Sequence, residues 1–216
     1  PIKIGFLATL SGAFAGLGED SLRGAEIALN EVKDPATGKY MVAGREILVI
    51  KEGTDATAAV ALEKAKKLVE QDNVDIVIGP LSGDEGIAVK DYSLTVPDKT
   101  FVNGVAGATE ISWPTNSPNF FNFAANGPQQ IAGLGNYVYN VKGYKTVATV
   151  GEDYSSPYSN IGGFMYQFCP AGGRVVQKNW VPIGTKDFSS VIARLPKDID
   201  AVMVALGGAD AVNFFK

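Results

Sequence analysis

The sequence of 216 residues contains no histidine and only one cysteine, Cys169. The absence of histidine excludes Ser-His-Asp and Cys-His nucleophile systems and the usual metal sites built from imidazoles. A single cysteine can form no disulfide within the chain. The G-x-x-x-x-G-K-[ST] loop that cradles nucleotide phosphates is missing as well. We therefore expect neither a metal nor another cofactor.

The sequence also lacks a long run of basic residues. Its 19 lysines and arginines stand against 23 acidic residues, which gives a net charge of -4. Proteins that follow nucleic-acid phosphates carry a basic patch or stripe, so we expect no nucleic-acid partner. The acidic residues are scattered in a way that is typical of solvated helix faces rather than of paired acid and base groups. We therefore expect a protein without catalytic function.

Charged residues are missing altogether from residues 111–141. This segment holds three prolines and six asparagines. Hydrocarbon would leave many of their polar groups unsatisfied, so the segment favours a soluble chain over a membrane span. The chain opens at Pro1 in a strand-like run without a secretion signal, as in a cytoplasmic protein that has lost its methionine or in an exported protein already processed. The sequence alone leaves both origins open.

Short apolar runs alternate with segments of helical spacing. The runs suit strands that are buried on both faces of a parallel sheet; they are Ile4–Leu7, Ile76–Ile78, Phe101–Val102, Val147–Val150 and Ala201–Ala205. Apolar residues recur at helical spacing in two segments between them; the positions are Ala58, Ala61, Leu62, Ala65, Leu68 and Val69, and then Ile161, Phe164, Met165 and Phe168. The alternation predicts an α/β fold with doubly wound parallel sheets.

A proline- and asparagine-rich segment, residues 113–128, separates two series of strands and helices. We predict a first lobe over residues 1–122 and a second over residues 123–216, with a bend at residues 122–128 when a ligand is captured. Loops at the carboxyl ends of parallel strands are where such sheets bind ligands. Function is therefore to be sought in those loops.

The first of these loops is rich in glycine and is expected over residues 9–18, before a helix that starts near Ser21. Its glycines would allow a ligand to approach the backbone closely. A dinucleotide fingerprint is disfavoured because Ser21 stands where G-x-G-x-x-G requires its third glycine after Gly16 and Gly18. A mobile glycine loop without ligand contacts remains open.

Three further loops follow predicted strands. At residues 79–86, helix-start amides and the Ser82 hydroxyl suit a carboxylate, although Ser82 or Asp84 can equally cap the helix. Residues 103–109 are small and would expose main-chain groups to a ligand, or form a plain turn. In the second lobe, residues 151–158 offer aromatic rings with polar tips, although Tyr158 can equally pack beneath its own helix.

Together these residues resemble the leucine/isoleucine/valine-binding family of the type I periplasmic binding fold. The matching pieces run in family order along nearly the whole chain; they are Ile4–Phe6 with Leu10–Gly12, Ile78–Ser82, Ala106–Thr109, Glu152–Tyr154, Lys186–Ser189 and Ile192–Leu195. The resemblance implies two doubly wound lobes with a ligand cleft between them. It also implies a periplasmic or otherwise extracytoplasmic receptor, usually monomeric, that captures a small solute by closure of the lobes and delivers it to an ABC-type membrane permease.

The resemblance further implies which residues bind the ligand. The first lobe would hold its carboxylate through the turn and the third loop, an apolar wall would stand at Leu17, and the second lobe would contribute its Asp-Tyr loop and the Gly207–Gly208 turn. The implied ligand-binding residues are Leu17, Ser82, Gly83, Asp84, Val105, Ala106, Gly107, Tyr154, Ser156 and Gly207.

The chain departs from the family in three respects. Gly83 and Gly107 stand where amino-acid binders often carry hydroxyl groups, the disulfide common in the first lobe is missing, and Cys169 is expected to be a packed helix residue instead. Relatives also continue beyond the position of Lys216, so the C-terminal part of the fold is expected to be incomplete. The ligand is therefore predicted to be a branched-chain or other hydrophobic amino acid, with an aromatic acid as the alternative. A Rossmann-like nucleotide-dependent enzyme is a further alternative.

Overall fold

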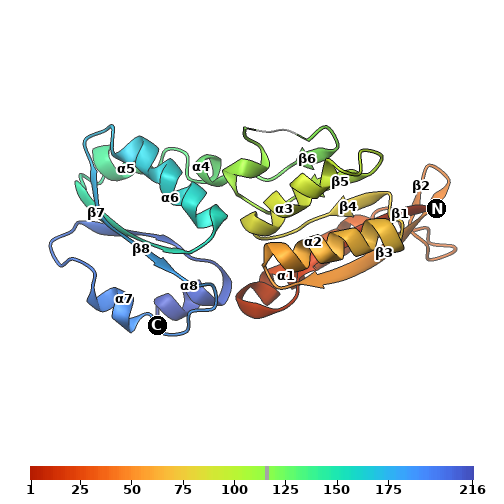
Figure 1. Ribbon diagram of the computed structural model, residues 1–216, viewed down its shortest axis with the longest axis horizontal. Coiled ribbons are helices and arrows are strands. Elements are labelled where there is room, and N and C mark those ends of the chain that lie inside the picture. Colours follow the sequence, from red (N-terminus) through yellow and green to blue (C-terminus); the bar gives the residue numbers. More distant parts are fainter. Residues whose placement is uncertain (115–116) are drawn as a thin grey trace. The chain divides into compact units, whose positions relative to one another are not determined.

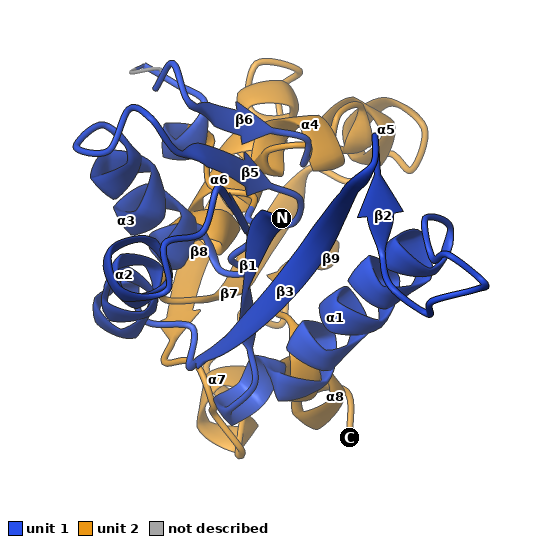
Figure 2. Ribbon diagram, turned by 90° about the vertical axis from the view of Figure 1, so that its right-hand side faces the viewer, with its two compact units in different colours: residues 1–106, 110–124 blue, residues 107–109, 125–216 orange. Residues whose placement is uncertain are grey.

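The computed structural model describes residues 1–114 and 117–216, which form two compact units. Unit 1 comprises residues 1–106 and 110–124, and unit 2 comprises residues 107–109 and 125–216 (Figure 2). The contacts thus divide the chain between residues 124 and 125 and assign a short piece of the third loop to unit 2. Each unit is described by itself below.

Unit 1 is built around a six-stranded sheet of order β2-β3-β1-β4-β5-β6. Its strands are β1 (Ile2–Thr9), β2 (Met41–Val42), β3 (Arg45–Thr54), β4 (Ile76–Ile78), β5 (Thr100–Asn103) and β6 (Phe120–Asn122). All neighbouring strands are parallel except the edge pair β2 and β3. The predicted strands at Ile4–Leu7, Ile76–Ile78 and Phe101–Val102 are therefore confirmed, two of them with longer bounds.

Helices cover the unit 1 sheet from both sides. They are η1 (Gly12–Phe14), α1 (Ala15–Asn30), α2 (Ala58–Lys66), the π-helical turn η2 (Lys67–Gln71), α3 (Gly83–Ser93) and η3 (Thr109–Ile111), the last of which begins in unit 2 and ends in unit 1. Figure 2 shows α1 on one face of the sheet and α2 with α3 on the other. The predicted apolar stripe of α2 and η2 faces the core, where Ala61, Ala65 and Leu68 are fully buried. Unit 1 is thus doubly wound.

The first helix begins earlier than the sequence suggested. A helix was expected from near Ser21 after a long glycine loop, whereas η1 starts at Gly12 and α1 already at Ala15. Gly16 and Gly18 therefore lie in a helix rather than in a loop. A Cβ atom on Gly18 would lie 1.7 Å from the carbonyl oxygen of Thr9, so this glycine serves the close packing of α1 on β1 and not the approach of a ligand.

Unit 2 contains a three-stranded parallel sheet of order β8-β7-β9. Its strands are β7 (Thr146–Glu152), β8 (Arg174–Val181) and β9 (Ala201–Ala205). Its helices are α4 (Gly127–Gln130), α5 (Leu134–Asn140), α6 (Ser155–Phe168), α7 (Ser189–Ala193) and α8 (Gly208–Phe214). Figure 1 shows α5 and α6 on one face of this sheet and α7 and α8 on the other. The second lobe is therefore doubly wound as well.

Two apolar clusters hold unit 2 together, one on each face of its sheet. Phe164 and Phe168 of α6 pack on Val147 of β7, and the two rings are stacked with centroids 4.9 Å apart. On the other face Val150 and Val181 pack against Phe188 and Val191. The predicted apolar stripe of α6 is thus confirmed. Cys169, expected to be packed, is instead exposed because α6 ends at Phe168 and Cys169 caps its end.

Candidate functional site

In each unit the strand order contains a topological switch point, where the connections that follow two neighbouring strands run to opposite faces of the sheet. In unit 1 the chain goes from β1 to β3 on one side and then returns to β4 on the other side of β1. In unit 2 it goes from β7 to β8 and then returns to β9. Ligands of doubly wound sheets bind at the carboxyl ends of such strands. The loops after β1, β4, β7 and β9 are therefore the candidate binding loops.

Ser82 caps α3 at the end of the loop after β4. Its hydroxyl accepts a hydrogen bond from the amide of Glu85 (3.3 Å) and donates one to the carbonyl of Ala56 (2.9 Å). The amide of Ser82 in turn donates to Oε2 of Glu85 (2.8 Å), which completes a capping box. The side chain of Ser82 thus acts as a cap and is buried, with 1% exposed. The amide of Gly83, the first residue of α3, has no acceptor within the helix.

Glu85 joins this cap to the end of β1. Its Oε2 also accepts a hydrogen bond from the hydroxyl of Thr9 (3.2 Å), while its Oε1 is buried without a hydrogen-bond partner among the described residues. Glu85 is fully buried and was not among the predicted site residues. The Ser-x-x-Glu spacing at positions 82 and 85 was the signal that could have revealed it, because that spacing is the capping-box pattern.

Asn103, the last residue of β5, shapes the third loop. Its Oδ1 accepts hydrogen bonds from the amides of Ala106 (2.9 Å) and Val105 (3.4 Å), and its Nδ2 donates to the carbonyl of Ala106 (2.8 Å). The sequence left open whether this loop exposes main-chain groups to a ligand or forms a plain turn; its hydrogen bonds to Asn103 hold the Val105 and Ala106 main chain in a turn. Ala106 is buried, whereas the side chain of Val105 is exposed. Gly107 belongs to unit 2, where its carbonyl accepts the amide of Gly127 (2.8 Å).

Leu17 and Asp84 lie in helices of unit 1. Leu17 is the third residue of α1 and its side chain is exposed. Asp84 is the second residue of α3 and is half-buried. Leu17 was expected in a loop and is displaced from it by the early start of α1.

A hollow of about 460 Å³ lies beside α1 in unit 1. Its walls are almost entirely apolar and include Phe6, Leu22, Leu29, Ile78 and Leu81. The volume suits a small molecule. The hollow runs from Pro80 and Val105, in the loops after β4 and β5, along β1 to Val32 and Val42. Its lining offers no charged group to a carboxylate, so we do not assign the carboxylate to it.

Tyr154 and Ser156 stand at the beginning of α6 in unit 2. Tyr154 is the extended residue that precedes the helix, and Ser156 lies in its first turn; both are half-buried. Tyr158, one turn further, donates to Asp153, and its ring meets the ring of Trp180 edge-on with centroids 4.6 Å apart. Tyr158 is also partly exposed, so it does not simply pack beneath its own helix.

Gly207 follows β9 and contacts the end of β7. Its amide donates to Oε1 of Glu152 (3.1 Å), and Gly207 is the extended residue that precedes α8. Glu152 and Asp210 are both buried, with 1% exposed. The pKa of the Glu152 carboxyl is raised to about 8, mainly by burial and also by the nearby carboxyl of Asp210, while the Gly207 amide opposes the rise. Neither carboxyl was among the predicted site residues, because nothing in their spacing along the chain indicates that they meet.

Two negative findings bear on the site. Among the described residues no group of three or more histidine, cysteine, aspartate or glutamate side chains could hold a metal ion. No helix in the same part of the chain is long and apolar enough to cross a membrane.

Each unit is a doubly wound α/β sheet, and sheets of this kind bind ligands at the carboxyl ends of their strands. The family model described as "Periplasmic binding protein" matches residues 1–216. The chain belongs to this family. The resemblance to the leucine/isoleucine/valine-binding family and the type I periplasmic binding fold are thereby confirmed, and the family and its structural neighbours are solute-binding proteins rather than enzymes.

Similar proteins support this assignment. The "Leu/Ile/Val-binding protein homolog 8" of Brucella abortus is 29% identical over 229 residues, which cover 100% of this chain and 54% of the relative. A solute-binding protein from R. palustris, solved in complex with benzoate, has a TM-score of 0.89 at 25% identity. The match covers 100% of this chain and 58% of that protein. A branched-chain amino acid transporter substrate-binding protein from Streptococcus pneumoniae, solved in complex with isoleucine, has a TM-score of 0.77 at 25% identity. The match covers 94% of this chain and 56% of that protein. The chain thus spans about half the length of the curated relatives that it matches.

Proposed function

We propose that this chain is part of a periplasmic solute receptor that captures a small monocarboxylate with an apolar body and delivers it to an ABC-type permease. The observation that carries the proposal is the capped start of α3. There the side chains of Ser82 and Glu85 each accept a hydrogen bond from the amide of the other residue. The amide of Gly83 has no acceptor within its helix. A helix start of this kind, with its positive dipole end, attracts a carboxylate.

The remaining predicted residues complete this proposal. Asp84 and Val105 would flank the carboxylate in unit 1, and Leu17 would wall the apolar body. Tyr154, Ser156 and the Gly207 turn would bind from unit 2, with Ala106 and Gly107 supplying the loop backbone. Capture by closure of the two lobes remains part of the proposal. Scattering profiles that coincide with and without a tight ligand would contradict it.

The amine of the ligand distinguishes the two proposed ligand classes. Relatives of similar identity are named for branched-chain amino acids or were solved with benzoate, which has no amine. A carboxylate is common to both ligands. The start of α3 is therefore proposed to bind the shared group, while the choice between an amino acid and an aromatic acid depends on other contacts.

A thermal-shift screen tests the proposal and the ligand class together. The screen uses leucine, isoleucine, phenylalanine, benzoate and 4-hydroxybenzoate. A ligand at one hundred times its Kd adds about 2.7 kcal/mol of stability, which for a chain of this size shifts Tm by roughly 5–11 °C. A shift with leucine or isoleucine supports the amino-acid receptor, and a shift with benzoate alone supports the aromatic-acid receptor. If none of the five shifts Tm, the monocarboxylate proposal is wrong.

A pair of variants tests the contact at Gly83. Gly83→Pro removes the amide proton, and proline is tolerated at the first position of a helix, especially after the extended Ser82. Gly83→Ala adds a Cβ but keeps the amide proton. We expect Gly83→Pro to weaken binding of the active ligand at least tenfold and Gly83→Ala to change it much less. Equal losses in both variants would show that the amide is not the contact.

A further inference from the structure

Two buried carboxyl groups meet at the point in unit 2 where the chain leaves β7 and β9 toward opposite faces. Glu152 is the last residue of β7, and Asp210 is the third residue of α8. Both side chains are buried, with 1% exposed. Both residues bond the same turn, since Glu152 accepts the amide of Gly207 (3.1 Å) and the amide of Asp210 donates to the carbonyl of Gly207 (3.1 Å). Burial and the nearby carboxyl of Asp210 both favour the protonated form of Glu152.

One oxygen of each carboxyl accepts the amide of a glycine. Oε1 of Glu152 accepts the amide of Gly207 (3.1 Å), and Oδ2 of Asp210 accepts the amide of Gly184 (2.7 Å). Gly207 lies in the loop after β9, and Gly184 lies in the loop after β8. Glu152 itself opens the loop after β7, two residues before Tyr154. The carboxyl pair thus ties together all three loops at the carboxyl edge of the unit 2 sheet.

Among the described residues, Asp210 is the charged group that raises the pKa of Glu152. The other titratable groups of the three loops are Asp153, Tyr154, Lys186 and Asp187. Asp153 faces outward and bonds Tyr158, and Lys186 and Asp187 are exposed. Tyr154 is half-buried. In the part of the chain that the structure describes, none of the cations of these loops is buried beside the pair, so loss of a proton held by the pair would leave two negative charges close together in a dry environment.

We propose that Glu152 and Asp210 share one proton and that this proton positions the Gly207 turn and the Tyr154 loop for ligand binding, so that binding weakens when the proton is lost. Two ionised carboxylates would repel each other, and one of them would have to turn toward water and release its glycine amide. Glu152 and Asp210 are positioning residues, since they act through Gly207 and the neighbouring loops. The inference rests on the proposed function because Gly207 and Tyr154 were assigned to the ligand there.

Ligand affinity at two pH values tests the inference. With a Glu152 pKa of about 8, about one tenth of the molecules keep the proton at about pH 9 and nearly all keep it at about pH 7, so the affinity for leucine or benzoate should fall about tenfold. Glu152→Gln keeps the shape of the side chain, can accept from Gly207 and can donate permanently to Asp210. We expect this variant to bind at both pH values with the affinity that the unaltered chain has at about pH 7.

A matched control and a second variant sharpen this test. Asp198→Asn removes an exposed carboxylate before β9, at the opposite edge of the same sheet, and should leave the tenfold change intact. Asp210→Asn supplies a donor to Glu152 from the other side and should abolish the change, as Glu152→Gln does. If Glu152→Gln retains the pH dependence of the unaltered chain, the inference is overturned.

Two measurements without ligand separate this inference from the proposed function. Infrared spectroscopy should detect a protonated carboxyl at about pH 7 that disappears by about pH 9 and is missing in Glu152→Gln. Over the same interval, hydrogen exchange of the Gly184 and Gly207 amides should accelerate more than that of amides within β7, but not in Glu152→Gln. If these two changes occur while neither leucine nor benzoate binds at either pH, the shared proton is supported and the proposed ligand class is wrong. If the exchange of both glycine amides accelerates no more than that of the β7 amides, the proposed positioning role is wrong.

Discussion

Gly18 of α1 and Thr9 of β1 are in backbone contact: a Cβ atom on Gly18 would lie 1.7 Å from the carbonyl oxygen of Thr9 and 2.5 Å from its carbonyl carbon. No rotamer change can relieve this overlap, because both sides of it are main chain. We expect Gly18→Ala to lower the free energy of unfolding by about 2–4 kcal/mol through a forced shift of α1. Urea denaturation followed by circular dichroism measures the loss.

Gly24 provides the control in the same helix. It is exposed, and a Cβ atom there would meet nothing within 4 Å. Gly24→Ala should therefore raise the free energy of unfolding by about 0.5–1 kcal/mol, since alanine is the better helix former. If both glycine variants change stability alike, helix propensity rather than the contact with Thr9 governs position 18.

Ser82 stabilises unit 1 through two hydrogen bonds of its hydroxyl group. Ser82→Ala removes the cap of α3 and leaves the carbonyl of Ala56 without its donor in a buried place. We expect a loss of about 2–3 kcal/mol in the free energy of unfolding. Thr57→Ala, which removes the exposed cap of α2, should cost about 1 kcal/mol or less. A smaller loss for Ser82→Ala than for Thr57→Ala would contradict the role of the buried bond to Ala56.

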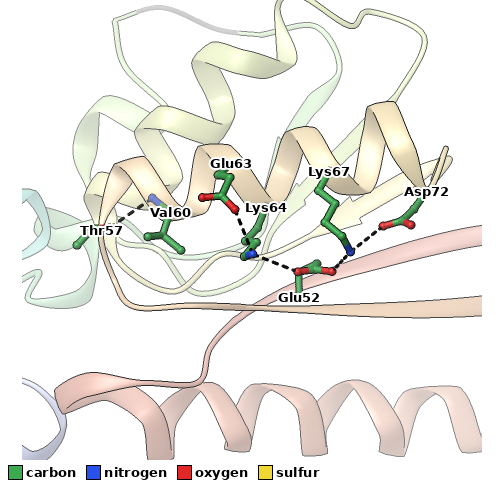
Figure 3. A network of polar contacts seen from close by, with 7 residues as sticks. All are labelled: Glu52, Thr57, Val60, Glu63, Lys64, Lys67 and Asp72. Atoms are coloured by element: carbon green, nitrogen blue, oxygen red, sulfur yellow. Dashed lines mark hydrogen bonds and ion pairs between the residues drawn. The ribbon is translucent and has the colours of Figure 1, made fainter.

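Glu52 of β3 joins α2 and η2 to the sheet through ion pairs. It contacts Lys67 and, at 3.9 Å, Lys64, and Lys67 also reaches Asp72 at 3.5 Å (Figure 3). The hydrogen bond with Glu52 raises the pKa of Lys67 above its ordinary value. Glu52→Gln should lower stability slightly at low salt, and about 1 M NaCl should remove the difference, because salt screens partly exposed pairs. Glu63→Gln is the control, since Glu63 is mostly exposed and pairs with Lys64 at the surface. A loss for Glu52→Gln that persists in salt would indicate packing rather than charge.

Glu152 makes the stability of the chain depend on pH. Its pKa is raised from 4.5 to about 8 in the folded state, so between these values the folded chain keeps a proton that the unfolded chain has lost. The stabilising contribution is therefore fully present below about pH 4.5 and is lost as the pH rises to about 8. We expect Glu152 to lower the free energy of unfolding by as much as a few kcal/mol over that interval. Urea denaturation at about pH 5 and pH 8 should show a clearly smaller decline for Glu152→Gln than for the unaltered chain. Equal declines would assign the effect to other groups.

Much of the fold was predictable from the sequence because burial on both faces of a parallel sheet leaves a local pattern. Strands at Ile76–Ile78 and Ala201–Ala205 were predicted at the bounds that the structure has. The apolar stripe of α6 was equally visible, since helical spacing selects one face. The first helix was placed too late because glycines at positions 16 and 18 read as a loop, whereas tertiary contact with β1 favours glycine there.

The candidate site was predictable only in part, since its contacts join residues that are distant along the chain. The capped turn at Ser82 follows from a spacing of three residues, which the sequence displays. Asn103 and its loop show no such signal, because side chains of many types can end a strand. The pairing of Glu152 with Asp210 depends on β7 and β9 being neighbours, which strand order alone decides.

The sequence by itself determined that this protein is a doubly wound α/β chain of the periplasmic binding family without imidazole chemistry. Hydrophobic periodicity and composition are local properties, and they survive in any conformation. Only the tertiary structure decided which main-chain groups face inward, why Gly18 must be a glycine, and that two carboxyls of unit 2 are buried beside the Gly207 turn. These features depend on distances between elements, and packing and burial set those distances after the chain has folded.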